Sequence, residues 1–356
     1  MLKKVAILGA GIGQQHLSAY LEVSHLFEVV LIVDQDISRA KALAGTSGIA
    51  VSKKIETALA DPAVDIIDIC LPPHLHVSTS LFALKAGKHV ICEKPVSTSL
   101  SELDAIRTET VQTNRRFYPV FQYRWGRSLT VLRYLKETGL TGAPHLASIE
   151  THWDRGAEYY ATAWRGTWAG EMGGAVLGHA IHNHGLLTHF MGPVSEVSAI
   201  TATRINPIET EDCAALSFKM KNGALATSSI TLGNATSETR LRFVFEHLTA
   251  TSGTEPYAPG AVPWRFIARD PSKQATLEDA IDKAPTERDG FAGFFEEIAK
   301  DIDGQPNSAV TLNDGYQSIS LVTAIYLAAC TGNVVNLPIS QDDPFYSGWQ
   351  PDQLNP

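Results

Sequence analysis

One lysine in this chain stands where a side chain could move a proton during catalysis. Residues 89–95, HVICEKP, begin as a short apolar run that is typical of a buried parallel strand. The residue before a proline avoids helical backbone, so Lys94 is expected at the carboxyl end of that strand, the edge at which open α/β sheets bind ligands. Partial burial there can lower a lysine pKa enough for proton transfer near neutral pH. Pro95 makes a cis peptide possible, and a solvated lysine in a loop is the plainer alternative.

Two histidines are a second candidate for acid-base chemistry. Residues 171–185, EMGGAVLGHAIHNHG, place two glycines before a helix that we expect to run to about Phe190. His179 and His182 lie three apart and therefore share a face of that helix. An imidazole can hold a hydroxyl group or pass a proton near neutral pH. The alternative is that both are hydrogen-bonded histidines on a buried helix face.

A zinc site is a third interpretation of this segment, because four histidines gather there: His179, His182, His184 and His189. Two observations disfavour it. His182 and His184 point to different sides of a helix, and no cysteine or acid joins the group at ligand spacing. We therefore expect no metal.

A glycine-rich turn near the start of the chain indicates a dinucleotide site. Residues 9–16, GAGIGQQH, follow the apolar run Val5 to Leu8 and precede a helical pattern. Glycines let the backbone approach a pyrophosphate, and the helix N-terminus supplies free N–H groups. The spacing is G-x-G-x-G, with Gln14 where the full motif has its third glycine, so the motif alone is weak. Its position at the start of a strand-turn-helix unit supports it.

An acidic residue follows the second expected strand, Val29 to Val33. A carboxylate at this position, here Asp34, accepts hydrogen bonds from the ribose hydroxyls and repels a 2′-phosphate, which favours NAD over NADP. Arg39, about one helical turn later, softens that preference. The alternative is that Asp34 only caps the helix that begins near Ile37.

Length and composition limit the remaining possibilities. A chain of 356 residues exceeds the usual size of a single core, so two domains are expected. The net charge of −9 disfavours nucleic acid or an anionic membrane as the main partner. The four cysteines are far apart in sequence, which suits a reducing cytoplasm. No apolar run is long enough for a membrane span, and the first residues lack a signal-peptide pattern.

The periodicities divide the chain into two kinds of domain. Alternating strands and helices over residues 1–125 predict an α/β Rossmann domain, a doubly wound parallel sheet that binds NAD. Its later elements are a strand at 64–71, helices at 77–85 and 99–113, and a strand or strand entry at 117–125. A histidine at the start of a helix, such as His76, most often caps the helix or packs against its neighbours.

Residues 126–335 predict an α+β domain for substrate binding and oligomerisation, with an open and mainly antiparallel sheet. Expected strands cover 146–153, 197–204, 213–220, 224–232 and 240–249, and Asn222-Gly223 is a hairpin signal. The uncovered sheet face suits a homodimer or homotetramer. Helices at 290–303 and 312–330 are expected to pack on the first domain, and the tail 336–356 on the body.

Together these segments resemble the Gfo/Idh/MocA family of oxidoreductases over essentially the whole chain. The resemblance rests on GAGIGQQH, Asp34, CLPPHLH at 70–76, AGKHVICEKP at 86–95 and FQYRW at 121–125. It implies that Lys94 is the catalytic lysine and that Gln122 lies near the nicotinamide ribose. The family's G-G-x-x-x-D-x-x-x-H helix places its histidine on His182 but its aspartate on Gly178. His179, next to that position, is the obvious substitute.

The expected chemistry is therefore NAD-dependent dehydrogenation of a sugar, sugar derivative or cyclitol, with Lys94, His182 and His179 as catalytic residues. Substrate contacts are expected from Tyr123, Trp153 and Asp154, and from the aromatic segment 159–164. Alternatives are a non-catalytic NAD or sugar sensor, and an enzyme with an internal NAD redox cycle. The residues expected to contact the cofactor are Gly9, Gly11, Ile12, Gly13, Gln14, Asp34, Leu71, Pro72, His76, Glu93, Lys94, Gln122, Trp164 and Arg165.

Overall fold

The computed structural model describes residues 2–350 and divides the chain into two compact units. The first unit comprises the residues up to Gln122 together with Phe291–Tyr316. The second comprises Tyr123–Gly290 and the residues from Gln317 onward. The expected boundary at residue 125 thus lies three residues earlier, and residues 291–316, which we expected in the second domain, return to the first unit.

The first unit contains the expected parallel sheet. Its order is β3-β2-β1-β4-β5-β6, and every neighbouring pair is parallel. The chain leaves β1 in one direction toward β2 and continues from β4 in the other direction toward β5, so the order reverses between β1 and β4. The strands are β1 (Lys3–Leu8), β2 (Phe27–Val33), β3 (Ala50–Ser52), β4 (Ile66–Ile69), β5 (His89–Cys92) and β6 (Phe117–Pro119).

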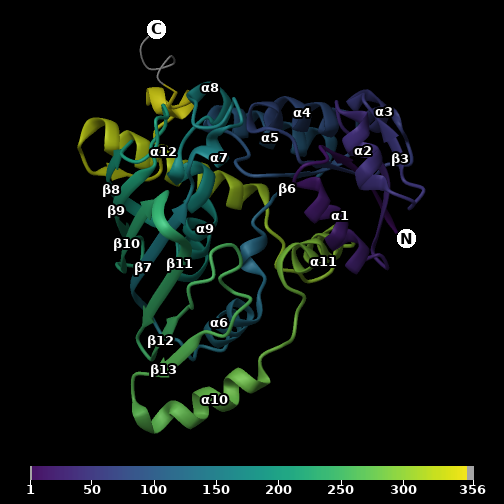
Figure 1. Cartoon of the computed structure of the whole chain (residues 1–356). Coiled ribbons are helices and arrows are strands. Elements are labelled where there is room, and N and C mark those ends of the chain that lie inside the picture. The colour runs from purple at the N-terminus through teal and green to yellow at the C-terminus, as the bar shows by residue number, and fades with distance from the viewer. Residues whose placement is uncertain (1, 351–356) are drawn as a thin grey trace. The chain divides into compact units, whose positions relative to one another are not determined.

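Helices cover this sheet on both sides, with α4 and α5 along one side and α1 and α11 along the other (Figure 1). The two on the second side pack through aromatic rings, since Tyr20 stacks on Phe295 at 4.0 Å. The helices are α1 (Gly13–Glu22), α2 (Ile37–Ala44), α3 (Ile55–Ala60), η1 (Pro73–Leu75), α4 (His76–Lys85), α5 (Leu100–Thr113) and α11 (Gly290–Ile302). The expected strand at 117–125 ends early, because residues Gln122–Arg124 form a 3-10 turn, η2.

The second unit contains an open sheet of eight strands in the order β13-β12-β11-β7-β10-β9-β8-β14. Only the central β7–β10 pair is parallel. The expected strand at 240–249 is two strands, because the Glu246 and His247 N–H groups bond to residues 143 and 141 instead of continuing the sheet. The strands are β7 (Pro144–Asp154), β8 (Val194–Ala202), β9 (Cys213–Met220), β10 (Leu225–Thr231), β11 (Gly233–Phe245), β12 (Leu248–Thr251), β13 (Arg265–Ala268) and β14 (Val335–Asn336).

One face of this sheet packs on helix α9 and the other is exposed. Leu146 and Leu225 are register partners on the exposed face and are 42% and 53% exposed. The helices of the unit are α6 (Arg127–Glu137), α7 (Ala157–Tyr160), α8 (Trp168–Glu171), η3 (Val176–Ala180), α9 (Ile181–Met191), η4 (Pro271–Lys273), α10 (Gln274–Lys283), α12 (Leu312–Thr331) and η5 (Pro344–Ser347). The first residues of α12, through Tyr316, belong to the first unit.

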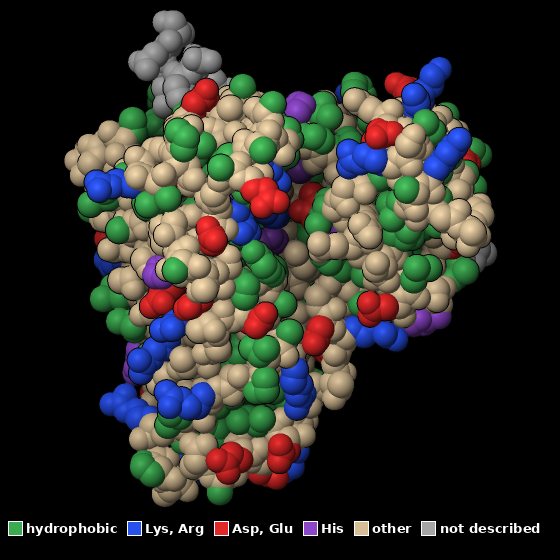
Figure 2. Space-filling model, in the orientation of Figure 1, with side chains coloured by type: hydrophobic (Ala, Val, Ile, Leu, Met, Phe, Trp, Pro, Cys, Tyr) green, Lys and Arg blue, Asp and Glu red, His purple; other side chains and the backbone are tan. Residues whose placement is uncertain are grey.

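The tail follows the second unit as far as the structure describes it. Strand β14 pairs with β8, and the Trp349 indole N–H donates to the Met172 carbonyl at 3.0 Å. Residues 351–356, the end of the expected tail, lie outside the described residues. Within residues 2–350, no helix combines the length and the apolarity that crossing a membrane requires. Acidic and basic side chains are interspersed on the visible face of each unit (Figure 2).

Candidate functional site

The turn after β1 needs glycine at two positions for folding and leaves space at a third. Gly9 has φ +104°, and a Cβ there would lie 2.3 Å from the Cys70 carbonyl oxygen. At Gly13 it would lie 2.8 Å from a methyl carbon of Ile7. At Gly11 it would meet only the Arg39 guanidinium, at 3.3 Å. The first and third glycines therefore let β1, β4 and α1 pack closely, whereas the middle one keeps space open above the turn.

Asp34 faces this turn. Its Oδ2 accepts a hydrogen bond from the Ala10 N–H at 2.8 Å. The cap of α2 is instead Asp36, which accepts from two N–H groups of the first turn. The capping alternative for Asp34 is therefore wrong. The Arg39 guanidinium lies 3.8 Å from Oδ2 and its side chain is 57% exposed, so solvent screens its effect on the carboxylate.

The remaining first-unit residues lie at the carboxyl ends of neighbouring strands. Leu71 and Pro72 follow β4, and half-buried Lys94 follows β5. The Lys94–Pro95 peptide is cis, and the Lys94 N–H donates to the Glu93 carboxylate at 3.0 Å. These ends border the point where the strand order reverses, which is where open α/β sheets bind ligands. Ile12 and Gln14 are exposed at the start of α1.

His76 has the packing role that its position at a helix start made the first expectation. Its ring nitrogens face two backbone carbonyl oxygens, Nδ1 that of Pro95 at 2.7 Å and Nε2 that of Leu71 at 2.8 Å, and a neutral imidazole donates to one of them. Burial lowers the pKa of the imidazole, although these carbonyls raise it. His76 joins the segment after β4 to the segment after β5 as a packing residue, and its contact with the cofactor stays a prediction.

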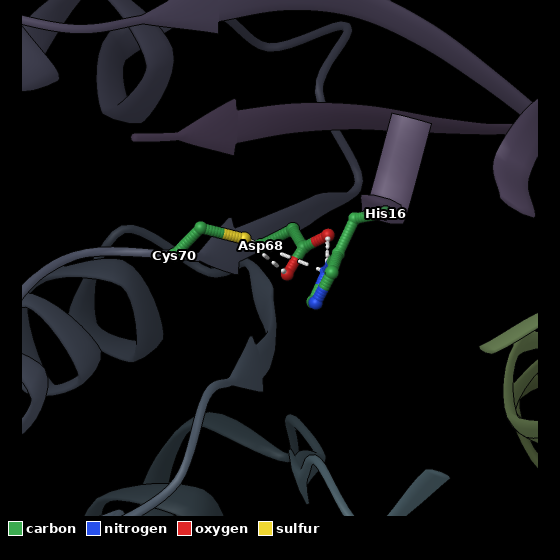
Figure 3. Close-up of side chains that lie close together, drawn as sticks. All are labelled: His16, Asp68 and Cys70. Carbon is green, nitrogen blue, oxygen red and sulfur yellow. Dashed lines mark hydrogen bonds and ion pairs between the residues drawn. The ribbon is translucent and has the colours of Figure 1, made fainter. Parts of the chain in front are cut away.

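A buried polar cluster in the first unit was not predicted. His16 on α1 contacts Asp68 on β4 through Nδ1 at 2.8 Å, and Glu93 through Nε2 at 3.1 Å. The Tyr20 hydroxyl donates to the same oxygen of Asp68 at 3.0 Å, and the Cys70 sulfur lies 3.4 Å from Nδ1. Figure 3 shows the imidazole and the thiol both directed at the Asp68 carboxylate. The cluster thereby links α1 to the residue that precedes Lys94.

The pKa shifts of His16 and Cys70 indicate the charge state of this cluster. Burial lowers the pKa of His16, but Asp68 and Cys70 outweigh that effect and hold the pKa well above its usual value. Burial raises the pKa of the Cys70 thiol to about 12. His16, Asp68 and Cys70 are the one group of metal-ligand types within reach of each other among residues 2–350. A protonated imidazole between two carboxylates satisfies the same atoms without an ion.

His16→Leu should lower the free energy of unfolding by about 3–5 kcal/mol, because it leaves two buried carboxylates without their cation. Urea denaturation measures the loss, with His25→Leu, at an exposed histidine, as the control. Since the pKa of His16 is raised, its contribution is complete below the usual histidine pKa and disappears only as pH rises through the raised value. A loss no larger than the control's would show that the cluster does not stabilise the fold.

The start of the histidine segment in the second unit is held by one buried acid. Glu211 accepts hydrogen bonds from the Gly174 and Val176 N–H groups at 3.1 and 3.0 Å, and from the Tyr326 hydroxyl at 2.9 Å. A Cβ on Gly174 would lie 1.9 Å from the Glu211 carbonyl oxygen. The two glycines therefore permit close packing against this segment. Burial raises the pKa of Glu211 to about 7, although these hydrogen bonds lower it.

Glu211→Gln should flatten the pH dependence of stability. A carboxyl whose folded pKa of about 7 exceeds its unfolded value of 4.5 binds more protons in the folded state. Its contribution to stability is full below the unfolded pKa and is lost as pH rises through about 7. The difference between the two urea midpoints, parent minus variant, should decrease as the pH is raised from about 5 to about 8. A constant difference would contradict the raised pKa.

The two candidate histidines lie on one continuous helix and meet different rings. Val176–Ala180 form a π-helical turn that runs directly into α9, so the expected helix is present but is not a regular α-helix at His179. His182 stacks on Tyr123, with ring centroids 4.3 Å apart. His179 contacts the Trp153 ring edge-on at 5.3 Å. Both imidazoles are buried, at 4% exposure.

The other histidines of the segment do not assemble a metal site with these two. His184 contacts Ser228 at 3.0 Å through Nε2, and burial lowers its pKa to about 4. No group of metal-ligand types is found around His179, His182 or His189 in the part of the chain that the structure describes. His184 is therefore a packing residue between α9 and β10.

Cationic and aromatic side chains gather beside His179. This arginine–aromatic cluster consists of Trp153, Arg155, Tyr159, Arg165 and Tyr257. Arg165 lies 3.9 Å from the centre of the Tyr159 ring and pairs with Glu171 at 3.2 Å, and its neighbour Trp164 is half-buried. Asp154, the last residue of β7, is exposed. In the first unit, the Gln122 side-chain oxygen is buried and has no hydrogen-bond partner among residues 2–350.

Two family models match the chain. The model described as an oxidoreductase family with an NAD-binding Rossmann fold, Gfo/Idh/MocA, matches residues 3–121. The model for a Gfo/Idh/MocA C-terminal domain matches residues 130–251. Together these segments cover more than half of the sequence.

Relatives and solved structures agree with these matches. The chain is similar to the uncharacterized oxidoreductase YrbE of Bacillus subtilis, at 32% identity over 62% of this chain and 64% of that protein. It is also similar to the myo-inositol 2-dehydrogenase of Thermotoga maritima, at 28% identity over 46% and 49%. The matched segments thus span less than two thirds of these relatives. The WlbA dehydrogenase of Chromobacterium violaceum, solved with NADH and UDP-GlcNAcA, has a TM-score of 0.83 at 27% identity and covers 95% of this chain and 97% of its own.

Proposed function

The chain belongs to the Gfo/Idh/MocA family of oxidoreductases, and from this premise we propose that it transfers a hydride between NAD and a CH–OH carbon of a sugar, sugar derivative or cyclitol. The observation that carries the proposal is the arrangement at one sheet edge. A glycine turn with open space, an acid that accepts a hydrogen bond from that turn and a half-buried lysine follow strands of the same parallel sheet.

The first unit has the groups that NAD requires. The open space at Gly11 and the free N–H groups of α1 suit the pyrophosphate, and Asp34 suits the ribose hydroxyls. Its negative charge opposes a 2′-phosphate, so NAD is favoured over NADP. NAD supplies the hydride acceptor, while the protein supplies binding, orientation and proton handling.

Proton handling is assigned to three side chains. Lys94 takes the proton of the reacting hydroxyl as the hydride leaves, and His182 is the second group proposed to hold that hydroxyl. His179 assists in place of the family aspartate, whose position is Gly178 in this chain. A Cβ at Gly178 meets no described atom within 4 Å, so the glycine is not required by packing within residues 2–350.

The substrate class is supported by the relatives. One acts, by name, on myo-inositol, and one solved neighbour was crystallised with a nucleotide-linked sugar acid. Trp153, Tyr159 and Tyr257 provide aromatic surface and hydroxyl groups of the kind that bind sugar rings. We propose that Trp153, Tyr123 and Asp154 contact the substrate.

The absorbance of NADH tests this proposal against a panel of hexoses, pentoses, sugar acids, anhydrosugars and inositols, each with NAD and with NADP. NADH formation with one ring polyol, and a weaker response with NADP, is the expected result. Binding of NAD without turnover of any panel member would contradict the dehydrogenase assignment. It would favour a sensor or an enzyme in which NAD is reduced and reoxidised within one cycle.

We also propose that the protein forms a homodimer or homotetramer through the exposed face of the second-unit sheet. Leu146 and Leu225 lie opposite each other on that face, and Ile200 on β8 is 72% exposed. These exposed apolar side chains on an open sheet face are the contact that we propose for a second copy. Sedimentation should give a dimer or tetramer that Leu146→Glu weakens, and a monomer would contradict the assignment.

We further propose that the protein is cytoplasmic. Its four cysteines are free thiols, which supports a reducing compartment.

A further inference from the structure

The two arginines of the arginine–aromatic cluster differ in their charge partners. Arg165 is neutralised by Glu171, which also accepts the Gly166 N–H at 2.6 Å. Arg155 forms no ion pair with any residue between 2 and 350. The neighbouring Asp154 carboxylate is exposed and makes none with it. The cluster therefore carries one positive charge that the described protein leaves uncompensated.

Arg155 is nevertheless held in a defined position. Its guanidinium lies over three aromatic rings, those of Trp153, Tyr159 and Tyr257, at 5.0, 5.1 and 5.5 Å from their centres. It donates to the Tyr257 hydroxyl at 3.0 Å and to the Asp154 carbonyl at 2.7 Å. Its Nε is buried and has no hydrogen-bond partner among the described residues.

This arrangement is that of an anion receptor. A guanidinium fixed on aromatic faces loses little freedom on binding, and its planar fork matches the two oxygens of a carboxylate. A buried donor without a partner is costly, and an arriving anion removes that cost. The Trp153 ring contacts both Arg155 and His179, so the receptor lies one ring away from a proposed catalytic histidine.

We infer that Arg155 binds a carboxylate of the substrate, so that the protein acts on a sugar acid in preference to a neutral sugar. The inference rests on the proposed function and names its substrate class. The single uncompensated charge of the cluster matches one carboxylate. Glu171 would repel an anion from Arg165, which leaves Arg155 as the binding residue.

Uronic acids, compared with their neutral methyl esters, test this inference by turnover with NAD and by calorimetric titration of the NAD-loaded protein. The ester keeps the ring and removes only the charge. The acid should be preferred, and Arg155→Gln should lower kcat/KM and affinity for the acid about 10- to 100-fold while hardly changing those for the ester. Arg155→Lys should retain part of the preference. Arg265→Gln, at an exposed arginine of β13, should change neither.

The outcomes separate this inference from the proposed function. Equal use of acid and ester, an equal loss for both in Arg155→Gln, or no binding of any acid overturns the assignment of Arg155. A preference for sugar phosphates over sugar acids also overturns it. If neutral polyols are oxidised and Arg155→Gln does not change the rate, carboxylate binding by Arg155 is contradicted and the dehydrogenase assignment stands. Binding of an acid that depends on Arg155, without NADH formation, supports the role of Arg155 and contradicts the dehydrogenase assignment.

Discussion

Replacement of Lys94 by methionine should lower kcat by about 100- to 10,000-fold, the usual contribution of a positioned acid or base. Methionine keeps much of the apolar stem of lysine and removes only the ammonium group. Affinity for NAD should change far less, because we propose that the glycine turn and Asp34 hold the dinucleotide. Stopped-flow NADH formation and a separate NAD titration measure the two quantities.

The matched control is Lys85→Met, which removes an exposed ammonium from α4. Its Nζ lies 4.0 Å from Glu109 at the surface, a kind of pair that contributes little to stability. Its kcat should equal that of the parent protein. If Lys94→Met turns over as fast as the control, proton transfer by this lysine is excluded and His182 becomes the leading base.

Substitution of two neighbouring glycines by alanine should have opposite consequences. Gly9→Ala places a Cβ 2.3 Å from a carbonyl oxygen at φ +104°, so the first unit should fail to fold or lose more than about 3 kcal/mol of stability. Gly11→Ala meets only the flexible end of Arg39, so the protein should fold normally. Its methyl group occupies the space assigned to the pyrophosphate, and the Kd for NAD should rise about 10- to 100-fold.

Circular dichroism, urea denaturation and NAD titration distinguish the two variants. Gly156→Ala is the control, because it has ordinary backbone angles and no atom of the described residues within 4 Å of the new Cβ. If Gly11→Ala binds NAD as tightly as this control does, the space above the turn does not hold the pyrophosphate. A stable Gly9→Ala protein would contradict the close approach of β1 and β4.

The parallel sheet was predictable because local signals agreed with one another. Apolar runs, glycine turns and cap residues each mark an element end without information from distant residues. Ser99, for example, precedes α5 and caps it. The Asn222-Gly223 hairpin was located correctly for the same reason, since its turn chemistry is local.

Features that depend on distant partners were not predictable. Asp68 in the middle of an apolar strand was a signal that a partner must exist, but only the fold shows that the partner is His16. Glu211 and Tyr326 are likewise joined across a long sequence interval. The aromatic contact of Phe295 with Tyr20 explains why residues 291–316 return to the first unit, which the helical pattern alone could not indicate.

Site residues divide in the same way. Lys94 and Asp34 were placed correctly at strand ends because their signals are local. A strand precedes Lys94 and a proline follows it, and an apolar strand ends directly before Asp34. The π-helical turn at Val176–Ala180 has no such signal, so the two histidines were expected on one regular helix. Arg155 was missed because its significance lies in the three rings around it.

Hydride transfer itself is tested most directly with a ring polyol or sugar acid that carries deuterium at its ring carbons. The NADH formed is isolated and its nicotinamide C4 is examined by NMR. One deuterium at C4 and a slower rate than with the undeuterated substrate are the expected results. Product formed without deuterium in the cofactor would contradict direct hydride transfer from the substrate to NAD, and with it the function proposed for this protein.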